Sequence, residues 1–135
     1  MGCDIAMLLL NSIFERTWGG RAGPRPATEY WVDVISTIKN KYPRFLFIAE
    51  AYWGLEWKLQ QQQGFDFCYD KKLYDRLEHC NAESIRLHLC AGLAYQGKLL
   101  RFIENHDEPR AAATFSPARG APEGETNETE PKVSH

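Results

Sequence analysis

The stretch Leu99-Leu100-Arg101-Phe102-Ile103-Glu104-Asn105-His106-Asp107, followed by Glu108-Pro109, decides how the fold of this chain is interpreted. The apolar run 99–103 predicts a buried strand, and Pro109 suits the first turn of a following helix. A histidine and an acid therefore stand where a strand ends and a helix begins. The stretch Phe45-Leu46-Phe47-Ile48-Ala49-Glu50 repeats this arrangement upstream. Acids at the C-terminal ends of successive parallel strands are typical of (β/α) barrel active sites.

The remainder of the chain alternates between helical and strand patterns. Helices are expected over 5–14, from Thr28 to Tyr42, over 55–62 and over 72–95 with a break near Asn81, and strands over 45–49, 65–69 and 99–103. Such alternation predicts an α/β fold with a parallel sheet. An open doubly wound sheet is the competing architecture, but the chain has no GxGxxG or P-loop motif.

Composition limits the classes of function. The chain has 135 residues, 44% of them hydrophobic, and a net charge of −2, which fits one modest domain and predicts no nucleic-acid or membrane partner. No apolar run approaches the roughly 20 residues of a spanning helix, and the run 5–10 lacks the flanks of a signal peptide, so we expect a cytoplasmic protein. Four cysteines without a CxxC pair (Cys3, Cys68, Cys80 and Cys90) predict buried free thiols and no zinc site.

The composition changes near Ser116. Residues 116–135 are rich in Pro, Gly, Glu, Ser and Thr, and Val133 is their only large aliphatic residue. Such a segment buries too little apolar surface to offset its ordering entropy, so it is predicted to be disordered. We therefore expect a domain over 1–115 and a tail over 116–135.

Three motifs, in order, resemble those of the alpha-amylase family of glycoside hydrolases (glycoside hydrolase family 13). Cys3-Asp4-Ile5-Ala6-Met7-Leu8 is similar to the motif that ends the fourth barrel strand of the family. Phe47-Ile48-Ala49-Glu50-Ala51-Tyr52-Trp53 is similar to the fifth-strand motif, and Phe102-Ile103-Glu104-Asn105-His106-Asp107 to the seventh. The resemblance covers residues 2 to 115 and implies a partial (β/α)8 TIM-type barrel, strands four to seven with their helices.

The resemblance also implies a role for each site residue. Asp4 would be the catalytic nucleophile, Glu50 the general acid/base and Asp107 a stabiliser of the transition state, while His106 would bind sugar hydroxyls. This division suits a retaining glycosidase, in which one carboxylate attacks the anomeric carbon and a second carboxyl group protonates the leaving oxygen.

Aromatic residues are the other candidates for sugar binding. Trp18, Tyr52 and Trp53 are predicted to contact substrate, whereas the helical spacing of Trp31 and Trp57 favours packing between elements, with sugar stacking as the alternative for Trp57. Asp70, before two lysines, is predicted to begin a solvated helix.

The resemblance implies a retaining glycoside hydrolase that acts on alpha-glucan or related oligosaccharides. No metal or other cofactor is assigned. Calcium, which some members of the family bind, stays open, because the loop that usually supplies its ligands lies largely upstream of the residues that carry the resemblance. The chain departs from the family at Gly2, where the family carries an arginine two residues before the nucleophile. With three barrel strands and their motif absent, we expect a fragment of impaired activity whose exposed sheet edges favour self-association. The alternatives are a non-catalytic carbohydrate-binding remnant and a fragment without function.

Overall fold

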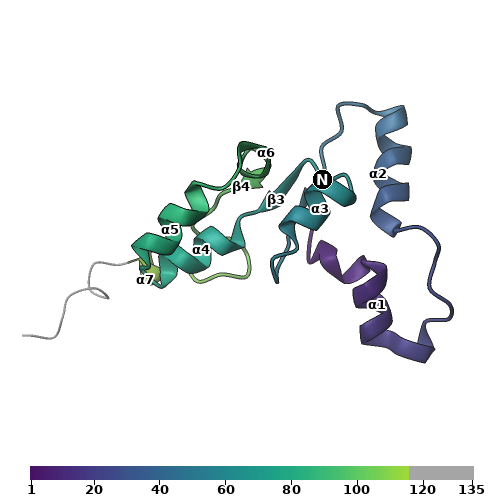
Figure 1. Ribbon diagram of the computed structural model, residues 1–135, viewed down its shortest axis with the longest axis horizontal. Coiled ribbons are helices and arrows are strands. Elements are labelled where there is room, and N and C mark those ends of the chain that lie inside the picture. The colour runs from purple at the N-terminus through teal and green to yellow at the C-terminus, as the bar shows by residue number, and fades with distance from the viewer. Residues whose placement is uncertain (116–135) are drawn as a thin grey trace, which may run out of the picture. The chain divides into compact units, whose positions relative to one another are not determined.

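Residues 1–115 are described by the computed structural model, and they form a mixed α/β structure around a small parallel sheet (Figure 1). The chain divides into two compact units, Met1–Ile103 and a second unit that begins at Glu104. The predicted disorder of the tail concerns residues outside the described part of the chain. The division into two units does not test the expected domain over 1–115, which stays a prediction.

The sheet has four strands in the order β1-β2-β3-β4, and each pair of neighbours is parallel. Their bounds are Gly2–Cys3 for β1, Ile48–Ala49 for β2, Phe67–Tyr69 for β3 and Leu99–Leu100 for β4. The α/β class and the parallel sheet are therefore confirmed. Within residues 1–115 the sheet is open, with β1 and β4 as its edges, and self-association through those edges stays a prediction.

The strands are shorter than predicted, and the backbone at Phe47 shows why for β2. The amide of Phe47 donates to the carboxylate of Asp66 over 2.8 Å, and its carbonyl accepts from the amides of Asp66 and Phe67. The Asp66 side chain thus accepts the hydrogen bond that the Phe47 amide would otherwise donate to a neighbouring strand, one residue before β2 begins. An apolar run predicts burial, but the extent of a ladder depends on such partners.

The helices follow the predicted order with altered boundaries. The α-helices are α1 Asn11–Trp18, α2 Tyr30–Lys41, α3 Glu56–Gln62, α4 Lys71–Glu78, α5 Ala82–Leu89, α6 Leu93–Gln96 and α7 Ala111–Thr114. Two 3₁₀ helices, η1 Ala6–Leu9 and η2 Gly19–Arg21, flank α1.

Capping side chains explain the best-predicted helix boundaries. Asn81 accepts a hydrogen bond from the amide of Ser84 over 2.9 Å, which confirms the predicted break and starts α5. The continuous helix over 5–14 was wrong, because Leu10 adopts an extended backbone between η1 and α1. The helix expected at Pro109 begins two residues later, at Ala111.

The core of the first unit lies between the sheet and the helices that follow its strands. Its fully buried apolar side chains include Leu10, Phe47, Leu59 and Phe65. The indole of Trp31 donates to the carbonyl of Ala6 over 2.7 Å and lies edge-on to Phe65, which joins α2 to η1 and confirms the packing role of Trp31. Trp57 is 52% exposed, but its ring lies 6.3 Å from that of Tyr95 of α6, so packing between elements is confirmed for it as well.

All four cysteines carry free thiols, as predicted, but only two are buried. Cys3 and Cys68 lie in the core, whereas Cys80 and Cys90 are exposed. Burial raises the pKa of the Cys3 thiol, and it raises the pKa of Cys68 to about 12. The prediction of burial was wrong for Cys80 and Cys90, since both stand at the C-terminal ends of helices.

Candidate active site

The sheet register brings Asp4 and Glu50 together. Cys3 of β1 is the partner of Ala49 of β2, so the two acids are the next residues on adjacent strands. The backbone pairing continues past them, because the Glu50 amide donates to Cys3 over 2.9 Å and its carbonyl accepts from Ala6 over 3.0 Å. A carboxylate oxygen of Asp4 lies within 4.8 Å of one from Glu50. The two acids thus form a close pair at the C-terminal edge of the sheet.

The two carboxylates differ in their surroundings. Asp4 is exposed, whereas Glu50 is 3% exposed. Oε2 of Glu50 accepts from the amide of Ile5 over 3.0 Å, and Oε1 is bonded to the Tyr52 hydroxyl over 3.0 Å. A tyrosine hydroxyl can donate or accept, so this second bond can form in either protonation state of Glu50. One acid is therefore open to a ligand, and its neighbour is held in a fixed orientation.

Backbone strain marks both motifs. Ile5 has φ +43° and Trp53 has φ +59°, a left-handed region that β-branched and bulky residues rarely adopt. Each such residue costs on the order of 1–3 kcal/mol, and this kind of strain is concentrated at functional sites. Ile5 directly follows Asp4, and Trp53 stands three positions after Glu50. Cys80, with φ +51°, is a third such residue within residues 1–115 and lies outside both motifs.

Trp53 presents its ring to solvent. It is 66% exposed and borders a pocket of about 540 Å³ that is also lined by Arg16 of α1 and by Leu55 and Lys58. Of the other aromatic candidates, Tyr52 contacts Glu50 as described. Trp18, at the end of α1, is 52% exposed, with its ring 6.3 Å from that of Phe14.

His106 and Asp107 belong to the second unit, which is described by itself. Nε2 of His106 lies 3.7 Å from Oδ2 of Asp107, and both side chains are about half exposed. The Asn105 side chain accepts from the amides of Asp107 and Glu108, over 3.0 Å and 2.8 Å. This turn fixes the backbone of the motif. That Asp107 and His106 share a site with Asp4 and Glu50 stays a prediction.

Glu104 anchors the same turn to α7. Its carboxylate accepts from the Ala111 amide over 2.8 Å and from Arg110 over 3.0 Å. These two hydrogen bonds, with the backbone amide first, lower the pKa of Glu104. The residue that precedes Asn105 is therefore structural within its unit.

The sequence did not predict a buried polar cluster, which consists of Asp70, His88 and Glu56. Asp70, predicted to be solvated, is 1% exposed; it caps α4 through the amide of Leu73 and lies 2.8 Å from Nε2 of His88. The signal was present, because Asp70 follows the strand 65–69 just as Glu50 follows its own strand. What the sequence did not reveal was the partner, since His88 is 18 residues away on α5.

Glu56 is the second acid of that cluster. It is 1% exposed, and its Oε2 accepts no hydrogen bond from the described residues, with the ammonium of Lys72 3.7 Å away. Burial, more than any other factor, raises the pKa of Glu56. The acid therefore keeps its proton to higher pH than an exposed glutamate does.

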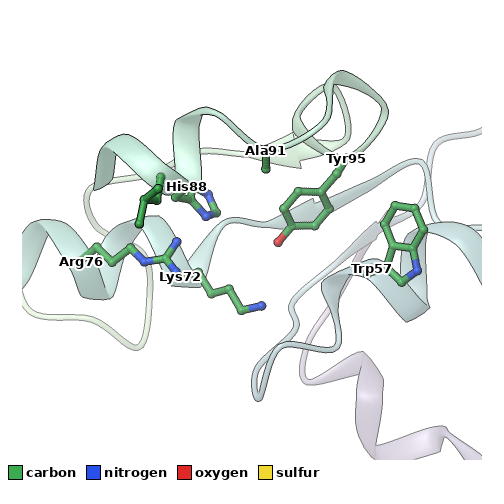
Figure 2. Close-up of a pocket in the computed structure, with 7 residues that line it drawn as sticks. Trp57, Lys72, Arg76, His88, Ala91 and Tyr95 are labelled. Carbon is green, nitrogen blue, oxygen red and sulfur yellow. The ribbon is translucent and has the colours of Figure 1, made fainter. Parts of the chain in front are cut away.

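A shallow pocket of about 350 Å³ opens next to this cluster (Figure 2). Its walls are Lys72 and Arg76 from α4, Trp57 from α3, His88 from α5 and Tyr95 from α6. None of these residues was a sequence-based candidate for the catalytic pair. The pocket is therefore a feature separate from Asp4 and Glu50.

Comparisons with protein-family models, with curated proteins and with solved structures found no match for this chain. None of the helices within residues 1–115 has the length and apolar character needed to cross a membrane. The residues of the chain are therefore the basis on which a function is inferred.

Proposed function

We propose that this chain carries the catalytic pair of a retaining glycoside hydrolase of the alpha-amylase type, which acts on alpha-glucan or related oligosaccharides. The separation of Asp4 and Glu50, whose nearest oxygens lie within 4.8 Å, is the observation that supports it. Retaining glycosidases hold their two carboxyl groups about 5–5.5 Å apart, whereas inverting enzymes need roughly 6.5–9.5 Å to admit a water molecule.

In this proposal the exposed carboxylate of Asp4 attacks the anomeric carbon of the sugar while Glu50 gives its proton to the departing oxygen. The resulting glycosyl ester on Asp4 is hydrolysed by water, from which Glu50 then takes a proton. The amide of Ile5 and the hydroxyl of Tyr52 hold the carboxyl group of Glu50 from two sides. Such orientation matters because displacements of about 1 Å can cost on the order of a hundredfold in rate.

The remaining roles rest on the resemblance alone. Asp107 would stabilise the positive charge of the transition state, and His106 would bind sugar hydroxyls. The strained and exposed Trp53 supports a role as a platform for a sugar ring, with Tyr52 and Trp18 as further aromatic candidates. The partial (β/α)8 barrel belongs to the same proposal, supported by four parallel strands in sequential order.

A second candidate function is a non-catalytic carbohydrate-binding module, and Gly2 favours it. The family's arginine at this position would orient the nucleophile through charge-assisted hydrogen bonds, which a glycine cannot make. A Cβ added at Gly2 would meet no heavy atom within 4 Å. A side chain can therefore begin at this position, but the natural chain has none there.

An activity assay separates the two candidates. It measures hydrolysis of an activated alpha-glucoside and of maltooligosaccharides by the natural chain and by Glu50→Gln. A catalytic pair predicts hydrolysis that Glu50→Gln nearly abolishes. A binding module predicts sugar binding in calorimetry, with no hydrolysis by either protein. Activity that is unchanged by Glu50→Gln would remove Glu50 from the assignment.

A further inference from the structure

The pocket lined by α3, α4, α5 and α6 offers hydrogen-bond donors and aromatic rings to a ligand. Lys72 and Arg76 stand on α4, and Figure 2 shows the hydroxyl of Tyr95 directed from the opposite wall toward them. The rings of Trp57 and Tyr95 are 6.3 Å apart and inclined by 54°. No carboxylate is among the lining residues. The polar groups at the pocket surface thus suit an acceptor of hydrogen bonds.

Arg76 is the uncompensated charge of this pocket. Within residues 1–115 its guanidinium makes neither a hydrogen bond nor an ion pair. Lys72, in contrast, lies 3.7 Å from Glu56, and the buried Asp70 is matched by His88 and by Arg101 at 3.8 Å. The buried acids below the pocket therefore already have cationic partners, and Arg76 remains available to an anion.

The Tyr95 hydroxyl stays protonated at neutral pH and can donate a hydrogen bond. Burial raises its pKa to about 12, and the buried acids Glu56 and Asp70 add to the shift. At neutral pH it therefore keeps its proton and can donate to an anionic oxygen. Guanidinium, ammonium and hydroxyl donors together match a phosphate monoester, which carries about −1.5 to −2 charges and three acceptor oxygens.

We propose that this pocket binds a phosphorylated sugar, with the phosphate against Arg76 and Lys72 and the sugar ring against Trp57 and Tyr95. Trp57 and Tyr95 offer ring faces to the C–H groups of a pyranose, and the comparison with a nucleotide below tests a sugar against a planar base. The site is distinct from the Asp4–Glu50 pair, and its occupation does not depend on hydrolysis.

The test is calorimetric titration of the full chain with glucose 6-phosphate, glucose, inorganic phosphate and adenosine monophosphate. We expect glucose 6-phosphate to bind at least tenfold more tightly than each of the other three. Equal affinity for inorganic phosphate would mean an unspecific anion site, and equal affinity for the nucleotide would mean a different ligand class. Either result, or no binding of glucose 6-phosphate, would overturn the proposal.

Variants assign the binding to this pocket. Arg76→Gln should weaken glucose 6-phosphate by roughly ten- to hundredfold, as expected for loss of a charged hydrogen bond, and Arg76→Lys should restore part of the affinity. Arg44→Gln is the matched control, because Arg44 is exposed and lies outside the pocket. Equal affinity of Arg76→Gln and the natural chain would contradict the assignment. Circular dichroism of each variant excludes loss of fold as the cause.

Discussion

The backbone amide of Ile5 donates a 3.0 Å hydrogen bond to Oε2 of Glu50. The residue that follows one acid of the candidate pair thus orients the other. Ile5 can do so because its backbone is held at φ +43°, a conformation that an isoleucine resists. Local strain and the orientation of Glu50 are therefore parts of the same arrangement.

Replacing Ile5 by glycine tests the strain. Glycine adopts positive φ without steric cost, which offsets its larger entropy loss on folding. We expect the free energy of unfolding of Ile5→Gly, from urea denaturation, to stay within about 1 kcal/mol of the natural chain or to exceed it. Ile13→Gly, at a buried position in α1, should cost several kcal/mol. A loss at Ile5 as large as that at Ile13 would contradict a strained backbone.

Gly2→Arg tests the departure from the family motif. Because the position is exposed and a Cβ there meets no atom within 4 Å, the side chain can be added without disturbing the sheet. A guanidinium near Asp4 would orient that carboxylate, so we expect hydrolysis of an activated alpha-glucoside to rise about tenfold or more. Gly20→Arg is the control, since Gly20 also has open space around it. An equal effect of the two substitutions would point to added charge alone.

Much of the fold could be predicted from residue patterns, and the failures have physical causes. Asn81 and Tyr42 marked helix ends because a capping side chain and an X-Pro bond act locally. The start of β2 could not be predicted, because the Asp66 side chain accepts the hydrogen bond of the Phe47 amide. Local patterns predict an element's existence better than the extent of its pairing.

The candidate site also has one part that could be predicted from the sequence and another that could not. Asp4 and Glu50 could be predicted as neighbours, because parallel strands place their C-terminal ends at one edge. The pocket around Arg76 and Tyr95 could not, since its walls come from four helices whose contacts depend on tertiary packing. The burial of Asp70 likewise depends on His88, which a reading of the strand end alone does not reveal.

Glu56 should make stability depend on pH. Burial raises its pKa in the folded state, so the folded chain binds more protons than the unfolded chain between the ordinary glutamate pKa and the raised value. The stabilisation relative to Glu56→Gln is therefore complete below the ordinary pKa and is lost as pH rises through the raised one. Urea denaturation of both proteins from pH 4 to pH 8 measures this difference. A difference that grows with rising pH would have the wrong sign.

The thiols should fall into two classes. A thiolate is the reactive form, and burial both shields Cys3 and Cys68 and raises their pKa, for Cys68 to about 12. At pH 8 we expect Cys80 and Cys90 to react quickly with a chromogenic disulfide, and the two buried thiols only after denaturation. Mass spectrometry of the labelled peptides identifies the sites. Rapid labelling of Cys68 in the native chain would show that this part of the core opens readily.

The central claim is that Asp4 and Glu50 form a retaining pair. Its most direct test is proton NMR of the first sugar released from an alpha-linked maltooligosaccharide, by the natural chain or by Gly2→Arg, with Asp4→Asn and Glu50→Gln as inactive controls. The account predicts that the alpha anomer appears first and that neither control releases it. Initial release of the beta anomer, or release that survives both substitutions, would contradict it.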